Sequence, residues 1–335
     1  MDSTLVSILI PFKNTAAFLA ECLQSILEQD YTNWEVLAVN DGSTDASKDI
    51  VSQFALQEPR IKIIDNTGSG IIHALRLAYA RSKGGYITRM DSDDIMKPSK
   101  LSTMVSLLDA YGKGHIALGK VTYFSDRGIS NGYKRYEEWL NRLTINGANF
   151  NERYKECVIP SPCWMTHRDD LDKCGAFEND RYPEDYDLAF RMYANGLQCI
   201  PCSEVLHLWR DYDTRTSRTS EHYAQNYFLD IKLFYFLKQD WDKNRPLVLW
   251  GAGNKGKTIG KALIQKGIPF TWICDNPNKI GKQIYGIPML SYLDLKTLQN
   301  TQSIITVANE QAQQEILEFL TSQDKMAMKD YYFFC

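Results

Sequence analysis

The chain has 335 residues, of which 44% are hydrophobic and 24% are charged, and its net charge is −3. This length allows two domains with separate cores, and the composition is that of a globular protein. The lack of a basic surplus argues against nucleic acid as the main partner. No apolar run reaches the length of about 18 residues that a membrane helix needs, and the first residues lack a signal-peptide pattern. We therefore expect a cytoplasmic protein.

The N-terminal part of the chain alternates short apolar runs with helical periodicity, which is typical of a parallel α/β sheet. Between the runs, apolar residues recur at three- and four-residue spacing, as on one face of a helix. Ser43 or Thr44 is predicted to cap the second of these helices. The predicted strands are Val6–Ile10, Trp34–Val39, Ile61–Ile64 and Tyr86–Met90.

The periodicity weakens in the middle of the chain. Residues 126–160 are polar and aromatic, and we expect an irregular region shaped by an acceptor. Order returns in a strand at Cys163–Thr166, in a helix that begins near Glu184 and in a strand at Leu206–Trp209. These elements complete a first domain, predicted to span residues 1–222.

A smaller second domain is predicted at the C-terminal end. An aromatic-rich stretch at 223–243 is expected to form a helical connector, and residues 244–335 a Rossmann-like domain. This domain opens with a strand at Leu247–Trp250, a glycine turn with its helix, and a second strand at Phe270–Cys274. That order is the start of a βαβ unit.

Polar clusters follow three of the predicted strands. Because ligands of open parallel sheets bind beyond the carboxyl ends of the strands, three successive clusters there indicate a ligand site. Each cluster taken alone is equally well explained as a turn or a helix cap. The clusters are Pro11-Phe12-Lys13-Asn14, Asn40-Asp41-Gly42-Ser43-Thr44-Asp45 and Asp91-Ser92-Asp93-Asp94.

The Asp91-Ser92-Asp93 segment indicates a metal site. Carboxylates two residues apart at a strand end can approach one divalent cation and a neighbouring ribose. Mg²⁺ and Mn²⁺ favour oxygen ligands and commonly bind through a few carboxylates together with substrate phosphates. The position directly after a buried strand strengthens a signal that would be weak on a loop.

These motifs resemble those of the family 2 glycosyltransferases, which have the GT-A fold. Two later segments extend the resemblance to about residue 220. Pro183-Glu184-Asp185-Tyr186-Asp187 resembles the Glu-Asp motif of the family, and Trp209-Arg210-Asp211-Tyr212 with Ser217 resembles the segment that closes the active site. The resemblance implies an α/β nucleotide-diphospho-sugar transferase fold, followed here by the small Rossmann-like domain.

The resemblance also implies a role for each matching residue. Asp41 reads a uracil-type base, with Pro11 and Phe12 in the same donor pocket. Asp91 and Ser92 face the donor, and Asp91 and Asp93 bind the metal, Mn²⁺ or Mg²⁺. Asp185 is the catalytic base, and Glu184 supports it. Arg210 contacts the donor, and His207 is a further candidate ligand, because Tyr212 stands where many relatives place a metal-binding histidine.

The function that follows is inverting transfer of a hexosyl or similar sugar. The donor is expected to be a UDP-sugar and the acceptor hydroxyl to belong to a saccharide or glycan, in the synthesis of a bacterial surface polysaccharide. An ionised aspartate suits the proton transfer that activates this hydroxyl. Contact with the inner face of the membrane through the acceptor, and homo-oligomer formation, stay open.

Two other functions are compatible with the same sheet. A sugar-1-phosphate nucleotidyltransferase usually has a glycine-rich loop after its first strand, where this chain has Pro11-Phe12-Lys13-Asn14. A non-catalytic nucleotide-sugar-binding protein would not need Asp93 and Asp185. Both therefore rank below glycosyl transfer.

The glycine turn of the second domain has two interpretations. Gly251, Gly253 and Gly256 fit the G-x-G-x-x-G pattern of dinucleotide-binding turns, and Asp275 follows at the distance of a ribose-binding carboxylate. The same glycines can instead serve close packing of helix on strand, which would make the turn structural. Because a lone pattern of this kind often occurs without a ligand, we favour the structural interpretation.

Overall fold

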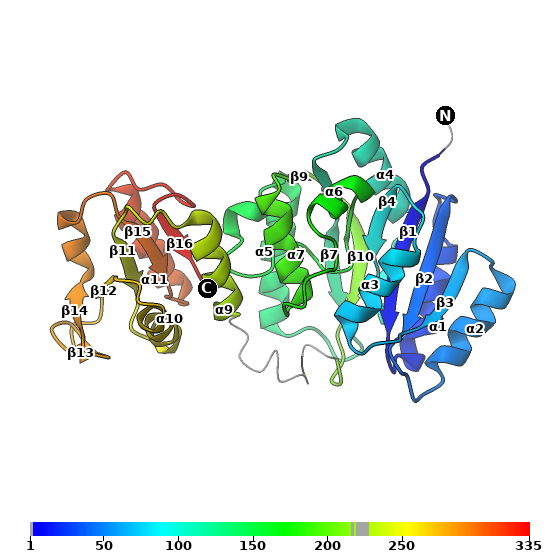
Figure 1. Ribbon diagram of the computed structural model, residues 1–335, viewed down its shortest axis with the longest axis horizontal. Coiled ribbons are helices and arrows are strands. Elements are labelled where there is room, and N and C mark those ends of the chain that lie inside the picture. The colour runs from blue at the N-terminus through cyan, green and yellow to red at the C-terminus, as the bar shows by residue number, and fades with distance from the viewer. Residues whose placement is uncertain (1–2, 216–217, 219–227) are drawn as a thin grey trace. The chain divides into compact units, whose positions relative to one another are not determined.

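The computed structural model describes residues 3–215, 218 and 228–335. The chain divides into two compact units, drawn in Figure 1. The first contains Met1–Phe150 and Cys157–Tyr223, and the second contains Asn151–Glu156 and Ala224–Cys335. The described part of the predicted connector therefore lies with the second unit, and its first five residues, 223–227, lie outside the described residues. Among the described helices, none is both long and apolar enough to cross a membrane.

The first unit is built on a mixed sheet whose order is β3-β2-β1-β4-β8-β6-β9. Figure 1 labels its strands β1 to β4. The first four of these strands are parallel, and β8 runs antiparallel to both β4 and β6. Their almost continuous apolar sequences fit a sheet that is covered on both faces. The strands are β1 (Val6–Phe12), β2 (Trp34–Asn40), β3 (Ile61–Asp65), β4 (Tyr86–Arg89), β6 (His115–Leu118), β8 (Trp164–His167) and β9 (Gln198–Ile200).

Helices cover this sheet and bury two apolar clusters against it. The helix α1, for example, buries Leu19, Cys22, Leu23 and Ile26, the face that the sequence periodicity predicts. The helices are α1 (Ala16–Leu27), α2 (Ser47–Gln57), α3 (Ile71–Arg81), α4 (Lys100–Tyr111), α5 (Asn131–Asn146), α6 (Arg168–Lys173) and α7 (Glu184–Ala194).

The first unit also contains a small second sheet in the order β5-β10-β7. Its central strand β10 (Val205–Arg210) pairs with β5 (Ile95–Met96), which directly follows the Asp91–Asp94 segment. On its other side β10 pairs with β7 (Lys120–Phe124). The pairing of β5 with β10 brings residues from opposite ends of the unit to the predicted metal segment.

Two local predictions were wrong. The region 126–160 contains the four-turn helix α5, capped by the Ser130 hydroxyl, and only Leu140, Leu143 and Thr144 of this helix are buried. A mostly solvated helix lacks the broad apolar stripe that reveals helices in a sequence. The helix α2 begins at Ser47, because Ser43 and Thr44 hydrogen-bond to Asn14 at the end of β1 instead of capping it.

The second unit has a sheet in the order β13-β14-β12-β11-β15-β16. All its strands are parallel except β13, so the unit has the expected Rossmann-like form. Its elements are α9 (Leu229–Tyr235), the π-helix η3 (Phe236–Asp240), β11 (Leu247–Trp250), α10 (Asn254–Gln265), β12 (Thr271–Cys274), β13 (Gln283–Ile284), β14 (Ile287–Ser291), the 3₁₀ helix η4 (Tyr292–Thr297), β15 (Gln302–Ile305), α11 (Glu310–Thr321) and β16 (Tyr331–Phe333).

A short stretch of the N-terminal sequence also belongs to the second unit. The 3₁₀ helix η1 (Asn149–Glu152) leads into Arg153 and Tyr154, and both of these side chains hydrogen-bond to Asp240 at the end of η3. The Tyr154 ring stacks on Phe334 at a centroid distance of 5.2 Å. The domain boundaries predicted from sequence did not include this excursion.

Candidate active site

The predicted polar clusters converge at one edge of the first sheet. The strands β2, β1 and β4 are parallel neighbours, so their carboxyl ends lie side by side. The ends of these strands carry Asp41, the Pro11-Phe12 pair and the Asp91–Asp94 segment, respectively. Convergence on one edge is the arrangement that the sequence predicted for a ligand site.

Asp41 is held by hydrogen bonds on one of its two carboxylate oxygens. Its Oδ1 accepts from Asn66 Nδ2 at 2.7 Å and from the Gly70 amide at 2.9 Å. Its Oδ2 lies 3.6 Å from the ammonium group of Lys13. The carboxylate is thus fixed in orientation while the side chain stays partly accessible.

Pro11 and Phe12 lie next to Asp41, but only Pro11 is partly exposed. The Phe12 ring is buried in the core, because successive residues of a strand face opposite sides. Its carbonyl accepts the Asp41 amide at 2.9 Å. The Phe12 side chain therefore faces the core, and Phe12 supports Asp41 through its backbone carbonyl.

The Asp91–Asp94 segment alternates between two environments. Asp91 and Asp93 are partly exposed, whereas Ser92 and Asp94 are buried. The Ser92 hydroxyl accepts from the Thr15 hydroxyl at 3.0 Å, which holds this side chain in the interior. Asp91 and Asp93 have the exposure that a shared ligand requires.

Asp93 lies in a setting that disfavours its negative charge. Burial and the neighbouring Asp94 raise the pKa of Asp93 to about 7. The Tyr212 hydroxyl donates to Asp93 Oδ2 at 2.9 Å. Within residues 3–215, 218 and 228–335, no three His, Cys, Asp or Glu side chains form a preformed metal cage. Mg²⁺ usually binds through one or two carboxylates, with substrate phosphate oxygens as further ligands, and Asp91 and Asp93 fit this pattern.

His207 lies inside the protein, below this segment. Its Nε2 is 3.0 Å from Asp94 Oδ2, and its Nδ1 is 3.3 Å from the ammonium group of Lys100. Since an ammonium group can only donate, Nδ1 accepts and Nε2 carries the proton. Burial, then Lys100, lowers the pKa of His207 well below its ordinary value. Both ring nitrogens have protein partners, so this arrangement offers no free ligand atom on His207.

Arg210 is also engaged by protein groups. Its Nε donates to the Asp93 carbonyl at 2.7 Å, and its guanidinium group also pairs with Glu21. The group lies over the rings of Phe18 and Phe124, 4.8 and 4.4 Å from their centroids. Arg210 therefore holds the backbone of the metal segment. Ser217, which completes this sequence match, lies outside the described residues.

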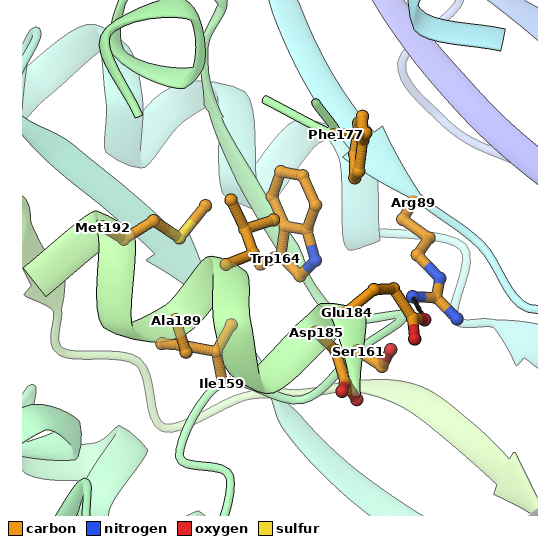
Figure 2. Close-up of a pocket in the computed structure, with 10 residues that line it drawn as sticks. Arg89, Ile159, Ser161, Trp164, Phe177, Glu184, Asp185, Ala189 and Met192 are labelled. Carbon is orange, nitrogen blue, oxygen red and sulfur yellow. Dashed lines mark hydrogen bonds and ion pairs between the residues drawn. The ribbon is translucent and has the colours of Figure 1, made fainter. Parts of the chain in front are cut away.

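Asp185 lies at the N-terminus of α7, in a small pocket shown in Figure 2. Its Oδ1 accepts the Tyr186 amide at 2.7 Å. Glu184 pairs with the buried guanidinium group of Arg89 at 2.8 Å, and Figure 2 shows the Asp185 carboxylate directed away from Arg89, beside Ser161. The rings of Trp164 and Phe177 line the apolar side of the pocket.

Burial in this pocket changes the acidity of both carboxyl groups. It raises the pKa of Asp185 above its ordinary value, and the positive charge of Arg89 opposes the rise. It raises the pKa of Glu184 to about 7, again against Arg89. The pKa of Asp185 therefore differs from the unperturbed value assumed from sequence, and a higher pKa makes its carboxylate a stronger base.

Arg89 is the site residue that sequence reasoning missed. Its Nε and a terminal nitrogen contact Asp91 Oδ1 at 2.9 and 2.8 Å, while its other terminal nitrogen contacts Glu184. It thereby joins the metal segment to the helix that carries Asp185. A charged residue within the apolar strand β4 was the available signal, because buried arginines are almost always paired.

In the second unit, the three glycines of the turn differ in whether the fold has space for a side chain at their position. Gly251 has φ of +116°, and a Cβ there would lie 2.6 Å from Thr306 Oγ1. A Cβ at Gly256 would lie 2.1 Å from the Gly251 carbonyl oxygen, so close packing excludes any side chain. At Gly253, by contrast, no described atom of the protein lies within 4 Å of the Cβ position.

A pocket of about 360 Å³ lies in front of this turn. Its lining includes Gly253, Lys255 and Asp275, and Asn309, the N-cap residue of α11, lines it as well. The strand β11 has β12 on one side and β15 on the other, so the pocket lies at the switch point where ligands of such sheets bind.

Comparisons with known proteins agree with the division of the chain into two units. Residues 7–175 match the family described as Glycosyl transferase family 2, and residues 242–328 match the family described as CoA binding domain. The glycosyltransferase GlyG of Streptococcus pneumoniae is 40% identical over 226 residues, which are 65% of this chain and 74% of GlyG.

Solved structures show the same fold for the first unit. TarS 1–349 of Staphylococcus aureus in complex with UDP has a TM-score of 0.52 at 16% identity, and the match covers 71% of this chain and 67% of the solved TarS 1–349 chain. The mannosyltransferase PcManGT of Pyrobaculum calidifontis, in complex with GDP-Man and Mn²⁺, has a TM-score of 0.53 at 20% identity, covering 71% and 65%. From the family match over half of its length and the similarity to GlyG, we conclude that this chain is a glycosyltransferase and belongs to family 2.

Proposed function

We propose that the protein transfers a sugar from a UDP-sugar to a saccharide or glycan hydroxyl with inversion, in the synthesis of a bacterial polysaccharide. The observation that carries this proposal is the junction made by Arg89. It connects Asp91, at the edge where Asp41 lies, with the helix of Asp185. A donor carboxylate and a candidate base are thus held by one buried side chain.

The donor side is assigned to Asp41, Asp91 and Asp93. Asp41 binds the base, and Asp91 and Asp93 would hold Mg²⁺ or Mn²⁺ against the diphosphate. When bound, such an ion supplies positive charge that stabilises the diphosphate leaving group. The partial exposure of both Asp91 and Asp93 beside the end of β4 supports this assignment, because both carboxylates are open to a shared ligand. TarS with UDP and PcManGT with Mn²⁺ are consistent with both ligands.

The acceptor side is assigned to Asp185. Its carboxylate takes the proton of the acceptor hydroxyl while the oxygen forms a bond to the anomeric carbon. The bond from this carbon to the diphosphate breaks, and its electron pair leaves with the diphosphate. A single displacement of this kind inverts the anomeric centre. The apolar lining of the pocket strengthens the base by raising its pKa.

Replacement of Asp185 tests the proposal. Asp185→Asn is isosteric and should lower transfer by about 10²- to 10⁴-fold, the usual contribution of a general base. Donor affinity should stay near the wild-type value, because the mutation lies on the acceptor side. Release of UDP from a panel of UDP-sugars measures transfer, and calorimetry measures affinity. Transfer at the wild-type rate would refute the role of Asp185. Formation of a UDP-sugar and pyrophosphate from UTP and a sugar-1-phosphate would instead identify a nucleotidyltransferase.

The open space at Gly253 favours a second function, which is nucleotide binding. We propose that the second unit binds a nucleotide at the pocket in front of the turn. The fold requires glycine at 251 and 256 but leaves open space at 253, where a bound pyrophosphate would need the close approach of the backbone. The match of residues 242–328 to the CoA binding domain family supports this proposal over a purely structural turn.

A further inference from the structure

The two oxygens of Asp41 are not equivalent. Oδ1 already accepts two hydrogen bonds, at 2.7 Å from Asn66 and at 2.9 Å from the Gly70 amide. A carboxylate oxygen has two lone pairs, so Oδ1 has no further capacity. Oδ2 faces the Lys13 ammonium group at 3.6 Å, which leaves room for one more donor.

This asymmetry is built into the loop that follows β3. The Gly68 amide donates to Asn66 Oδ1 at 3.1 Å, which fixes the side-chain amide so that Nδ2 points to Asp41. Gly70 has φ of +87°, a conformation that glycine adopts readily and that directs its amide to the same oxygen. The Asp41 side chain is only 11% exposed, so water cannot easily replace these partners.

A ligand base therefore meets one acceptor, Oδ2, beside one donor, Lys13. Uracil presents N3–H between two carbonyl oxygens, and its N3–H and one carbonyl match this pair. Cytosine has no hydrogen on N3. Guanine presents N1–H and an amino group side by side and needs two acceptors, but the second would be the saturated Oδ1. A polar group buried without a partner costs about 1–3 kcal/mol.

We propose that Asn66, together with the Gly70 amide, makes the donor site selective for uracil nucleotides by occupying Asp41 Oδ1. This inference rests on the proposed function, because it assumes that Asp41 faces the base of the donor. It assigns a specificity role to Asn66, which lies on a loop outside the polar clusters recognised in the sequence.

Binding of nucleoside diphosphates in the presence of Mn²⁺ tests the proposal. Inosine diphosphate differs from GDP only in lacking the amino group, so the wild-type protein should bind it about tenfold more tightly or better. UDP should likewise bind more tightly than CDP. In Asn66→Ala, which frees a lone pair on Oδ1, the difference between inosine diphosphate and GDP should fall below about threefold.

Asn33→Ala is the matched control. The Asn33 side chain donates to the Ser3 carbonyl just before β2, the strand whose other end leads to Asp41, and its loss should leave the base preference unchanged. Equal affinity of the wild-type protein for GDP and inosine diphosphate would overturn the role of Asn66, even if the variant did not fold. An unchanged difference in a folded Asn66→Ala would overturn it as well. Absence of binding by any nucleoside diphosphate would instead refute the proposed function.

Discussion

Arg89→Met removes the side chain that joins the two halves of the site. The substitution keeps most of the volume but leaves Asp91 and Glu184 without their shared cation. Since the Arg89 side chain is only 6% exposed, the loss should cost about 3–5 kcal/mol, as for other buried pairs that lose one partner. That is a large part of the 5–15 kcal/mol by which proteins of this kind are typically stable.

Arg89→Met should also change the pH dependence of the transfer rate. Arg89 lowers the pKa of Asp185, so its removal raises that pKa further. Because a base works in its deprotonated form, the acid limb of the rate profile should move to higher pH. Displacement of α7 should in addition lower kcat by about 10²-fold, the cost of a misplacement near 1 Å.

The assay is the pH dependence of UDP release, together with thermal unfolding, for Arg89→Met and Arg89→Lys. Lysine keeps a positive charge but cannot make all three contacts. Arg89→Lys should therefore bring the acid limb of the pH profile close to its wild-type position while kcat stays lowered. Arg168→Met is the control, because Arg168 donates to the Gly84 carbonyl and the Ser82 hydroxyl before β4, away from the site. An Arg89→Met enzyme with an unchanged pH profile would refute the coupling of Arg89 to the base.

Two further predictions concern the other binding sites. Asp93→Ala should abolish the dependence of UDP affinity on Mn²⁺, and calorimetry with and without a chelator would show it; a persisting metal dependence would leave Asp93 as a turn residue. In the second unit, Gly256→Ala should lower the unfolding temperature, whereas Gly253→Ala should leave it unchanged. NAD⁺ or CoA at a hundred times its dissociation constant should stabilise the wild-type chain by about 2.7 kcal/mol. Gly253→Ala should lose this stabilisation by the ligand. No thermal shift with either ligand would leave the turn structural.

The sequence predicted the parallel strands and their site edge well because burial on both faces produces continuous apolar runs. The helix α5 could not be predicted in the same way, since only Leu140, Leu143 and Thr144 of its sixteen residues are buried. The excursion of Asn151–Glu156 into the second unit depends on contacts with Asp240 and Phe334, which are far away in sequence. No local pattern reports such contacts.

Within the site, the sequence identified residues by type but not by the direction of their side chains. The two-residue spacing of Asp91 and Asp93 predicts a shared ligand, and the structure has both side chains partly exposed on a turn in which the Asp94 amide donates to the Asp91 carbonyl at 3.2 Å. The side chains of Ser92 and Phe12 are buried, which their residue types alone did not indicate. The contact of Asn66 with Asp41 depends on a loop conformation that the sequence shows only as Gly68 and Gly70.

A series of buried hydrogen bonds below the Asp91–Asp94 segment holds this segment in a fixed position. Lys100 donates to the Pro162 carbonyl at 2.5 Å and contacts His207, which pairs with Asp94, and Asp94 Oδ1 accepts the Arg210 amide. Apolar side chains in this place would be as stable or more so, because burying charged groups is costly. The buried polar contacts, however, tie Asp94 to the backbone of β10 and so fix one end of the turn that carries Asp91 and Asp93. We interpret this network of buried contacts as what keeps these two carboxylates exposed at the edge of the sheet.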